Sequence, residues 1–419
     1  MKRYRTTLLP ALFLSCATLC ACEKSDSEAI RKGDYLFGTL MSNPDRAESH
    51  SELGLDCASL TLRWEEFEPE EGVVNETYVE RVRADIEKFR AARMRIILDF
   101  GIHYPPYWVT QLDHCRYVNQ YGEAYQVTQT SGLNTLNGVF NQTVRDKMAA
   151  YVGRFFSRFD PSAFFAIRIG WGYYAELHYP GKSYNGRANC YWGYDPVALG
   201  RVPGLLPPGV GVNPVPDWKP GQPSPDHADA RRFIEWYLES LTDFQTFQIR
   251  TLRKYYDGYI NALYADWGVR PGQIEEAVEG DLGGLTFAEK YDQLQKGYDH
   301  ARFIAAIDDP KVIVFNTCLN ATCPYPMTSS IVDEQSADAR SWSPIHYVAS
   351  CAAKHPLGLR VWAENDGNDN YYAMRISFKR MQRYKLMGIM WAFEHNLYTD
   401  DPAYAQLYEY AKFIETYSY

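Results

Sequence analysis

The stretch FFAIRIGWGYYAELHYPG, residues 164–181, decides how the rest of the chain is interpreted. It begins with an apolar run, residues 164–169, which has the composition of a strand buried on both faces. Glycine and aromatic residues follow, and then a single carboxylate, Glu176. In barrels of alternating strands and helices, catalytic side chains project from the carboxyl ends of the strands. The stretch therefore predicts a barrel strand followed by a candidate catalytic acid.

The remainder of the chain repeats this pattern of a buried strand followed by a helix. Strands are expected at residues 34–40, 57–64, 95–101, 164–169, 258–268, 311–317, 359–365 and 389–396. Amphipathic helices are expected at residues 75–94, 140–159, 228–256, 286–307, 343–355, 371–388 and 401–419. Such alternation implies parallel strands joined by crossover helices. Eight units over residues 34–419 predict an α/β protein, a single-domain (β/α)8 TIM barrel.

An open, doubly wound sheet is the alternative architecture for alternating strands and helices. That fold requires a glycine-rich phosphate turn after its first strand. The chain has SNPDRAE at this place, which is not such a turn. The barrel is therefore the favoured architecture, with a long Pro- and Gly-rich loop at residues 181–227 beside its entrance.

Composition narrows the range of partners. Of the 419 residues 46% are hydrophobic and 23% charged, which is ordinary for a globular protein. A net charge of -9 without a basic stripe argues against a nucleic-acid partner. The 33 Tyr and 10 Trp residues slightly favour a carbohydrate ligand. No CxxC or HExxH motif is present, so we expect no metal or other cofactor.

The first 33 residues have the pattern of an export signal and a tether. A basic start, MKRYR, precedes the apolar run LLPALFLSCATLC, which is too short for a permanent membrane span. The run leads to Cys22, so we expect a lipoprotein signal peptide at residues 1–21, acylation of Cys22 and a tether at residues 22–33. A plain secretory signal is the alternative, and Cys16 is a weaker acylation candidate. The predicted location is the periplasm or cell surface, with membrane contact through the anchor alone.

Six cysteines remain after the signal: Cys57, Cys115, Cys190, Cys318, Cys323 and Cys351. An exported protein is able to form disulfides, but spacing alone does not choose among the possible pairings. Cys318 and Cys323 are close enough in sequence to pair locally.

Polar and aromatic residues gather where the predicted strands end, and these ends meet at one mouth of a barrel. Two of them are glutamates, Glu176 after the fourth strand and Glu364 at the end of the seventh. The residues expected to bind substrate around this pair are Arg63, His103, Trp108, Trp171, Tyr174, Asp266, Trp267, Asn316, Trp362, Asn365 and Trp391. Asn43, Trp64, Tyr104 and Glu394 are expected at the same mouth.

Two carboxyl groups across a pocket suit cleavage of a glycosidic bond. One donates a proton to the leaving oxygen, and the other, ionised, attacks the sugar or activates water. Glu176 lies among aromatic residues, which raise the pKa of a carboxyl, and is the candidate acid. Arg63 is expected to keep Glu364 ionised, although it is also placed to pair with Glu65 or Glu66. Asp366 and Glu394 are the rivals of Glu364 for the second role.

The motifs that surround these glutamates resemble those of the (β/α)8 retaining glycoside hydrolases, and among them the family 42 β-galactosidases. LRWEEFEPEEG resembles the family's second-strand signature, and YPPYWV followed by YVNQYGEAY resembles its third-strand region. Trp171 and Glu176 keep the family's fourth-strand spacing, but Ala175 stands where the family has asparagine. The resemblance implies Glu176 as acid/base and Glu364 as nucleophile.

Residues 175–180, AELHYP, also resemble the fourth-strand segment of β-amylases, which are inverting enzymes. Three functions are therefore considered. The first is a retaining β-glycosidase, β-galactosidase-like, acting on an oligo- or polysaccharide outside the cytoplasm. The second is an inverting, β-amylase-like hydrolase, and the third is a surface carbohydrate-binding barrel without activity. The separation of the two carboxyl groups differs between retaining and inverting enzymes.

Overall fold

The computed structural model describes residues 35–126, 135–322 and 335–418. Within them eight parallel strands close into one barrel, each paired with the next along the chain and β8 paired with β1. The strands are β1 (Leu36–Thr39), β2 (Cys57–Thr61), β3 (Arg95–Asp99), β4 (Ala166–Ile169), β5 (Tyr259–Tyr264), β6 (Val312–Asn316), β7 (Val361–Glu364) and β8 (Gly388–Trp391). This closure confirms the predicted (β/α)8 barrel and excludes the open sheet.

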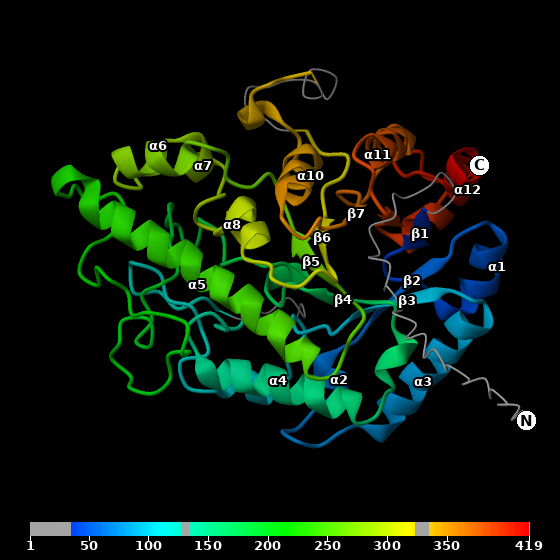
Figure 1. Ribbon diagram of the computed structural model, residues 1–419. Helices are drawn as coiled ribbons and strands as arrows, with labels where there is room; N and C mark the ends of the chain where they lie inside the picture. Colours follow the sequence, from blue (N-terminus) through cyan, green and yellow to red (C-terminus); the bar gives the residue numbers. More distant parts are fainter. Residues whose placement is uncertain (1–34, 127–134, 323–334, 419) are drawn as a thin grey trace, which may run out of the picture.

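Helices surround the strands (Figure 1). They are α1 (Ala47–Glu52), α2 (Trp64–Phe67), α3 (Glu76–Ala91), α4 (Gln142–Phe156), α5 (Ala228–Arg253), α6 (Gln273–Glu279), α7 (Phe287–Lys290), α8 (His300–Ala305), α10 (Pro344–Lys354), α11 (Tyr371–Arg383) and α12 (Leu407–Ser418). Several begin with a side-chain cap: Asn75, Asn141 and Ser343 accept hydrogen bonds from backbone N–H groups in the first turns of α3, α4 and α10.

The predicted helix at residues 286–307 is wrong in its extent. The chain forms only the short helices α7 and α8 there, with a loop between them. Asp292 (φ +73°) and Gly297 (φ +78°) have left-handed backbone conformations, which end a helix. A Cβ atom at Gly297 would also lie 2.7 Å from Cδ2 of Leu241, so a side chain there would have to displace that of Leu241. Similarly, the last helix begins at Leu407 rather than at residue 401.

Alternation along each strand divides the core into two parts. One face packs against the helices, and the other fills the barrel interior with a cluster that includes Ile97, Phe315, Trp362 and Met390. On β8, Met390 points into the barrel, whereas the next residue, Trp391, is fully buried in the outer layer, 6.0 Å from the ring of Tyr410 on α12.

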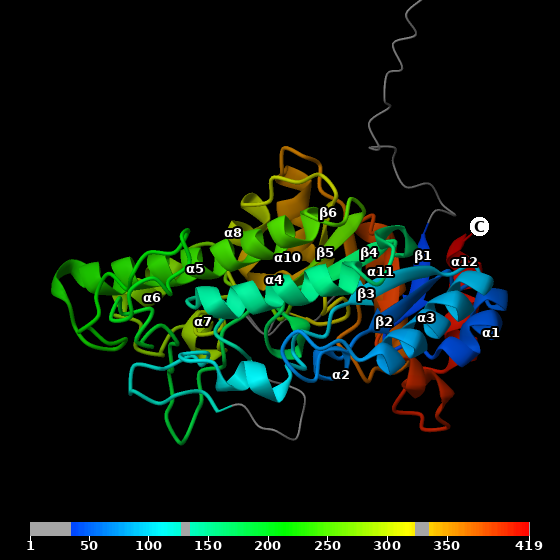
Figure 2. The same cartoon turned by 90° about the horizontal axis from the view of Figure 1, so that it is seen from below.

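The long helix α5 extends well beyond the barrel on one side, together with α6 (Figure 2). The loop at residues 181–227 packs on the first half of α5 through aromatic contacts. Tyr191 lies 5.7 Å from Phe233, and Tyr179, just before the loop, stacks on Tyr237 at 3.9 Å. Aromatic side chains thus hold this Pro- and Gly-rich loop against α5.

Within the described part of the chain, no helix combines the length and apolar character needed to cross a bilayer. The predicted signal peptide, Cys22 and the tether lie outside the described residues, as does Cys323. The five described cysteines, Cys57, Cys115, Cys190, Cys318 and Cys351, are free thiols.

The burial of Trp391 leads to a testable prediction. Trp391→Ala should lower the free energy of unfolding by about 3–5 kcal/mol, because it leaves a cavity between β8 and α12. Chemical denaturation followed by circular dichroism measures the change. Tyr408→Ala, at a side chain that is 70% exposed, serves as the control and should change stability little. An equal, small effect of both substitutions would contradict a core role for Trp391.

Candidate active site

A cavity of about 710 Å³ opens at the carboxyl ends of the strands and contains both predicted catalytic glutamates, Glu176 and Glu364. All eight strands or the loops that follow them contribute to its wall. One residue from each, in chain order, is Met41, Thr61, His103, Tyr174, Asp266, Thr317, Asp366 and Phe393. This volume is typical of a site for a small ligand or part of a larger one.

Glu364 forms a buried ion pair with Arg168 on the floor of the cavity. The guanidinium donates from Nη1 to Oε2 at 2.7 Å and from Nη2 to Oε1 at 3.3 Å. Burial raises the pKa of Glu364, and the charge of Arg168 opposes this rise. A bidentate pair of this kind favours the ionised carboxylate and fixes its orientation. Arg168, not Arg63, is therefore the cation that holds Glu364.

The turn between β4 and Glu176 is wound tightly on itself. Gly172 donates its N–H to the carbonyl of Glu176 at 3.0 Å. A Cβ atom at Gly170 would lie 1.9 Å from the carbonyl oxygen of Ala175, and one at Gly172 would lie 2.4 Å from that of Glu176, so neither position accepts a side chain. Gln248 of α5 clamps this turn, accepting from the N–H of Gly170 at 2.9 Å and donating to its carbonyl at 3.2 Å.

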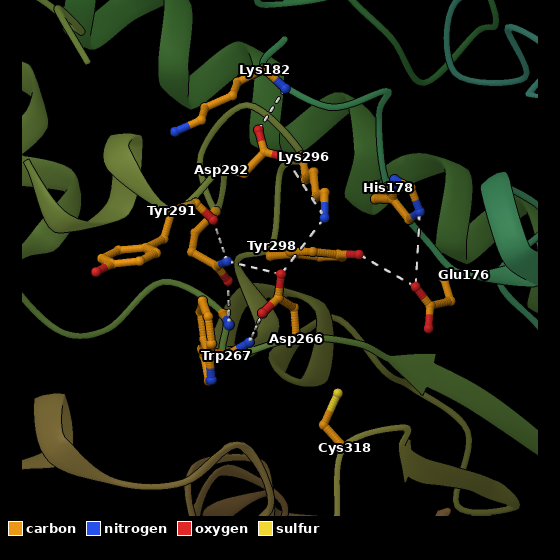
Figure 3. Close-up of polar contacts among 12 residues, drawn as sticks. Glu176, His178, Lys182, Asp266, Trp267, Tyr291, Asp292, Lys296, Tyr298 and Cys318 are labelled. Atoms are coloured by element: carbon orange, nitrogen blue, oxygen red, sulfur yellow. Dashed lines mark hydrogen bonds and ion pairs between the residues drawn. The ribbon is translucent and has the colours of Figure 1, made fainter. Parts of the chain in front are cut away.

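Glu176 has a different environment from Glu364 (Figure 3). Thr317 donates its hydroxyl to Oε1 at 3.1 Å, and Tyr298 donates to Oε2 at 3.5 Å. Burial and the negative charge of Glu364 raise the pKa of Glu176 to about 8. Glu176 is thus mostly protonated at neutral pH, which is the state that a general acid requires.

His178 lies 3.9 Å from Glu176, but the contact is not an ion pair. Burial and the nearby charge of Lys296 lower the pKa of His178 to about 4, so the imidazole is neutral at neutral pH. Its ring nitrogens lie 2.6 Å from the carbonyl of Tyr179 and 3.1 Å from that of Tyr173. His178 consequently braces the loop and contributes no positive charge to Glu176.

Four of the predicted substrate-binding residues line the cavity: His103, Tyr174, Asp266 and Asn365. Tyr174 is 57% exposed. Nδ1 of the buried His103 has no hydrogen-bond partner among the described residues. The amide of Asn365, in contrast, is used within the protein, since it donates to Ala392 and Asp369 and accepts from Ala392.

The other seven predicted residues do not line the cavity. Asn316 and Trp391 face outward, because the residues before them, Phe315 and Met390, face the barrel interior. Trp362 faces inward but lies in the interior cluster, two residues before Glu364. The remaining four contact neighbouring protein groups: Arg63 pairs with Glu65 and Glu66, Trp108 donates to the carbonyl of Glu68, Trp171 packs on Phe247 and Trp267 donates to the carbonyl of Thr322.

The two rivals of Glu364 occupy different surroundings. Glu394 is buried away from the cavity, paired with Arg46 at 3.0 Å and accepting from the N–H of Asn43 at 2.6 Å. Asp366 lines the cavity wall and accepts a hydrogen bond from the thiol of Cys318 at 3.3 Å. Among the described residues, neither has a bidentate cationic partner like that of Glu364.

Sequence reasoning missed seven polar residues of the cavity: Ser59, Thr61, Asp99, Arg168, Lys296, Tyr298 and Thr317. Arg168 carried a readable signal, since it is the one charged residue in the apolar run at 164–169 and a buried charge requires a partner. Lys296 and Tyr298 lie in a segment that was predicted to be helical, which concealed their position. Thr317 had no distinguishing pattern.

The fold and the cavity together define a (β/α)8 barrel with two unequal glutamates at the carboxyl ends of its strands. No protein-family model matches the chain, and no curated protein is similar to it in sequence. The structure is similar to the catalytic domain of a β-amylase from Paenibacillus polymyxa, with 15% identity, a TM-score of 0.59, and coverage of 92% of this chain and 99% of that one.

Two β-galactosidases are also similar in structure. The one from the haloarchaeon Halorubrum lacusprofundi has 13% identity and a TM-score of 0.57, over 91% of this chain and 58% of that chain. The one from Marinomonas ef1 has 10% identity and a TM-score of 0.54, over 91% and 59%. At these identities the similarity establishes the shared barrel fold.

The two glutamates predict a bell-shaped dependence of kcat/KM on pH for a glycoside substrate. Activity should fall as pH rises through about 8, where Glu176 loses its proton, and should fall on the acid side as Glu364 becomes protonated. Arg168→Met removes the cation that favours ionised Glu364, so the acid limb should move to higher pH. The pH profiles of both enzymes measure this shift.

Arg63→Met is the matched control, because Arg63 is 43% exposed and pairs with Glu65 and Glu66 outside the cavity. Its acid limb should coincide with that of the unmodified protein. A shift of the limb by Arg63→Met but not by Arg168→Met would restore Arg63 to the role expected from sequence.

Proposed function

We propose that this protein is a glycoside hydrolase that cleaves β-glycosidic bonds with retention of configuration. The observation that carries the proposal is the unequal environment of two glutamates in one cavity: Glu364 is paired to Arg168, whereas Glu176 is partly buried and has no cation bound directly to it among the described residues. A retaining glycosidase requires one ionised and one protonated carboxyl at its site.

In the proposed first step, a carboxylate oxygen of Glu364 attacks the anomeric carbon. The bond from this carbon to the leaving oxygen breaks, and Glu176 transfers its proton to that oxygen. In the second step, Glu176 takes a proton from water as the water oxygen attacks the anomeric carbon and displaces Glu364. Arg168 holds the nucleophile in place, and Thr317 and Tyr298 orient the acid.

An inverting, β-amylase-like reaction is the second candidate. It would use the same residues, with Glu364 activating a water molecule instead of attacking the sugar. The similarity of the barrel to a β-amylase catalytic domain over 99% of that chain favours keeping this candidate. Ala175 is buried and apolar where family 42 enzymes have asparagine, so a sugar would be held by other groups, of which His103 is one.

The proposed setting is outside the cytoplasm. The sequence of residues 1–22 supports export and acylation of Cys22, with the barrel tethered to a membrane and acting on oligo- or polysaccharide. Metabolic labelling with a radioactive or clickable fatty acid, compared between the native protein and Cys22→Ser, tests the anchor directly.

Replacement of either glutamate should abolish turnover without loss of the fold. Glu176→Gln removes the proton donor and Glu364→Gln removes the nucleophile, so each should lower kcat on an unactivated β-glycoside by at least about 10²–10⁴-fold. NMR of the first product formed by the unmodified protein should detect the β anomer before mutarotation.

Detection of the α anomer as the first product from a β-glycoside would contradict retention and indicate inversion of configuration. Binding of glycans without release of product, across a broad panel of β-glycosides, would instead favour the carbohydrate-binding barrel. Asp366→Asn is the control for a general loss of cavity charge and should retain far more activity than Glu364→Gln.

The charges of the cavity lead to a prediction about the substrate. Five carboxyl groups line it, those of Asp99, Glu176, Asp266, Glu364 and Asp366, against two cationic side chains, Arg168 and Lys296. Both cations contact carboxylates: Arg168 binds Glu364, and Lys296 lies 3.7 Å from Asp266 and from Asp292. A sugar carboxylate or sulfate would therefore meet net negative charge.

We accordingly expect uncharged sugars as substrates. An aryl glycoside of a neutral sugar should be hydrolysed at least about tenfold more efficiently than the matching uronide, because like charges in a confined site disfavour binding. The ratio of the two kcat/KM values, measured at low and high salt, is the test. Preferential hydrolysis of the uronide would contradict the expected exclusion.

A further inference from the structure

Lys296 lies on the wall of the cavity that contains Glu176, in the loop between α7 and α8. Its ammonium lies 5.5 Å from the ring centre of Tyr298, and the hydroxyl of Tyr298 is 3.5 Å from Glu176. Lys296, Tyr298 and Glu176 thus form a short chain of contacts that begins with a cation and ends at the proposed acid (Figure 3). The proposed mechanism assigns no role to the cation.

The backbone of Lys296 is fixed against the loop that carries Glu176. Its carbonyl accepts the N–H of Tyr179 at 3.0 Å, and its N–H donates to the carbonyl of Asp292 at 3.0 Å. The next residue, Gly297, has a left-handed backbone conformation (φ +78°), and a Cβ atom there would lie only 3.1 Å from the ring of Tyr179. The position of Lys296 relative to the β4 loop is therefore determined by the backbone.

Two carboxylates bracket the ammonium of Lys296. Asp266, on the cavity wall, and Asp292, outside the cavity lining, each lie 3.7 Å from it. Asp292 is itself anchored, because it accepts the N–H of Lys182 at 2.6 Å. Gln293 donates to Asp266 at 3.1 Å and so orients the other carboxylate. This arrangement holds a charge in place and is unlike a lysine that extends freely into solvent.

We propose that Lys296, held by Asp266 and Asp292, is a positioning residue that sets the pH at which Glu176 gives up its proton. The inference rests on the proposed role of Glu176 as the acid of a glycosidase. Among the groups that act on Glu176, burial, Glu364 and Asp266 raise its pKa, whereas the hydrogen bond from Thr317 and the charge of Lys296 lower it. Burial and Glu364 thus keep the acid protonated at neutral pH, and Lys296 limits the rise of its pKa, so that Glu176 is still able to release its proton.

The charged and polar groups that face Glu176 lie on β4, on β7 and on loops. Some of them are charged and some are neutral, so their effects on the protonation of Glu176 differ. Arg168 on β4 is paired with Glu364 on β7. His178, on the β4 loop, is neutral at neutral pH, and Thr317 and Tyr298 are neutral donors. Cys318 keeps its proton because burial raises the pKa of its thiol, and Asp266 contributes a negative charge. Two cationic side chains from the described part of the chain line the cavity, and one of them, Arg168, is bound to Glu364. Lys296 is therefore the other positive charge that acts on Glu176.

Two substitutions should move the basic limb of the pH profile in opposite directions. Lys296→Met removes a positive charge, so the limb should move to higher pH by roughly one unit, the low end of the effect of a nearby opposite charge. Asp292→Asn removes a negative charge that partly offsets the positive charge of the Lys296 ammonium. The lowering effect of Lys296 on the pKa of Glu176 should therefore increase, and the basic limb should move to lower pH. The amide introduced by Asp292→Asn still offers an oxygen to the N–H of Lys182, and Asp292 does not line the cavity, so KM should change little.

Two controls separate this role from a structural one. Lys296→Arg preserves the charge and should keep the limb within a few tenths of a unit of its original position. Lys147→Met removes a lysine that is also 26% exposed and ion-paired, with Glu71, but lies away from the cavity, and should leave the profile unchanged. Thermal unfolding of each variant checks that the fold is retained.

A measurement without turnover distinguishes failure of this inference from failure of the proposed function. The ¹³C resonance of the Glu176 carboxyl, assigned by its loss in Glu176→Gln, is titrated by NMR in the unmodified protein, Lys296→Met and Asp292→Asn. Opposite shifts of the titration midpoint support the inference even if no substrate is found. Unchanged midpoints, or shifts in the same direction, would overturn it.

Discussion

The bidentate pair between Arg168 and Glu364 is the interaction on which the rest of the cavity depends. Both charges are buried at the end of the barrel interior, where an unpaired charge would be strongly unfavourable. Because the partners come from β4 and β7, the pair also fixes these two strands relative to each other. Such a pair stabilises the fold weakly at best, since desolvation offsets much of the attraction, and its value here lies in the ionised state that it imposes on Glu364.

That charge has a consequence for the second glutamate. A fixed negative charge at Glu364, together with burial, raises the pKa of Glu176, so one group is ionised because of Arg168 and the other is protonated because of Glu364. The asymmetry required for acid–base chemistry thus follows from a single cation bound to one member of the pair. The hydrogen bond from Thr317 and, in our proposal, the charge of Lys296 in the loop between α7 and α8 limit how far the pKa of Glu176 rises.

Much of the fold could be predicted from the sequence, because eight apolar runs separated by helical patterns leave few architectures. The two glutamates were also predictable, since they follow strands four and seven. The orientations of the tryptophans could not be predicted. Successive residues of a strand point alternately into and out of the barrel, so the direction of each side chain depends on the exact boundaries of the strand. Trp391 and Asn316 fall on the outward face for this reason, and Trp362 lies one layer below Glu364.

The cation that pairs with Glu364 was misassigned for a related reason: Arg63 follows β2, but its side chain turns to Glu65 and Glu66, outside the barrel interior. A lone charge inside an apolar strand, such as Arg168, is thus a better indicator of a functional pair than a charge just after a strand.

The long helix α5 explains how two irregular loops hold their side chains accurately. Gln248 clamps the backbone of Gly170 at the end of β4, and one turn earlier Gln245 accepts from the hydroxyl of Tyr264 at the end of β5 and donates to the carbonyl of Phe303 on α8. One buried face of α5 therefore fixes the end of β4, which Glu176 follows, and also contacts the end of β5 and the helix α8 that follows the Lys296 loop. Loops without regular structure position catalytic groups well when their ends are fixed to the same rigid element, and here that element is α5.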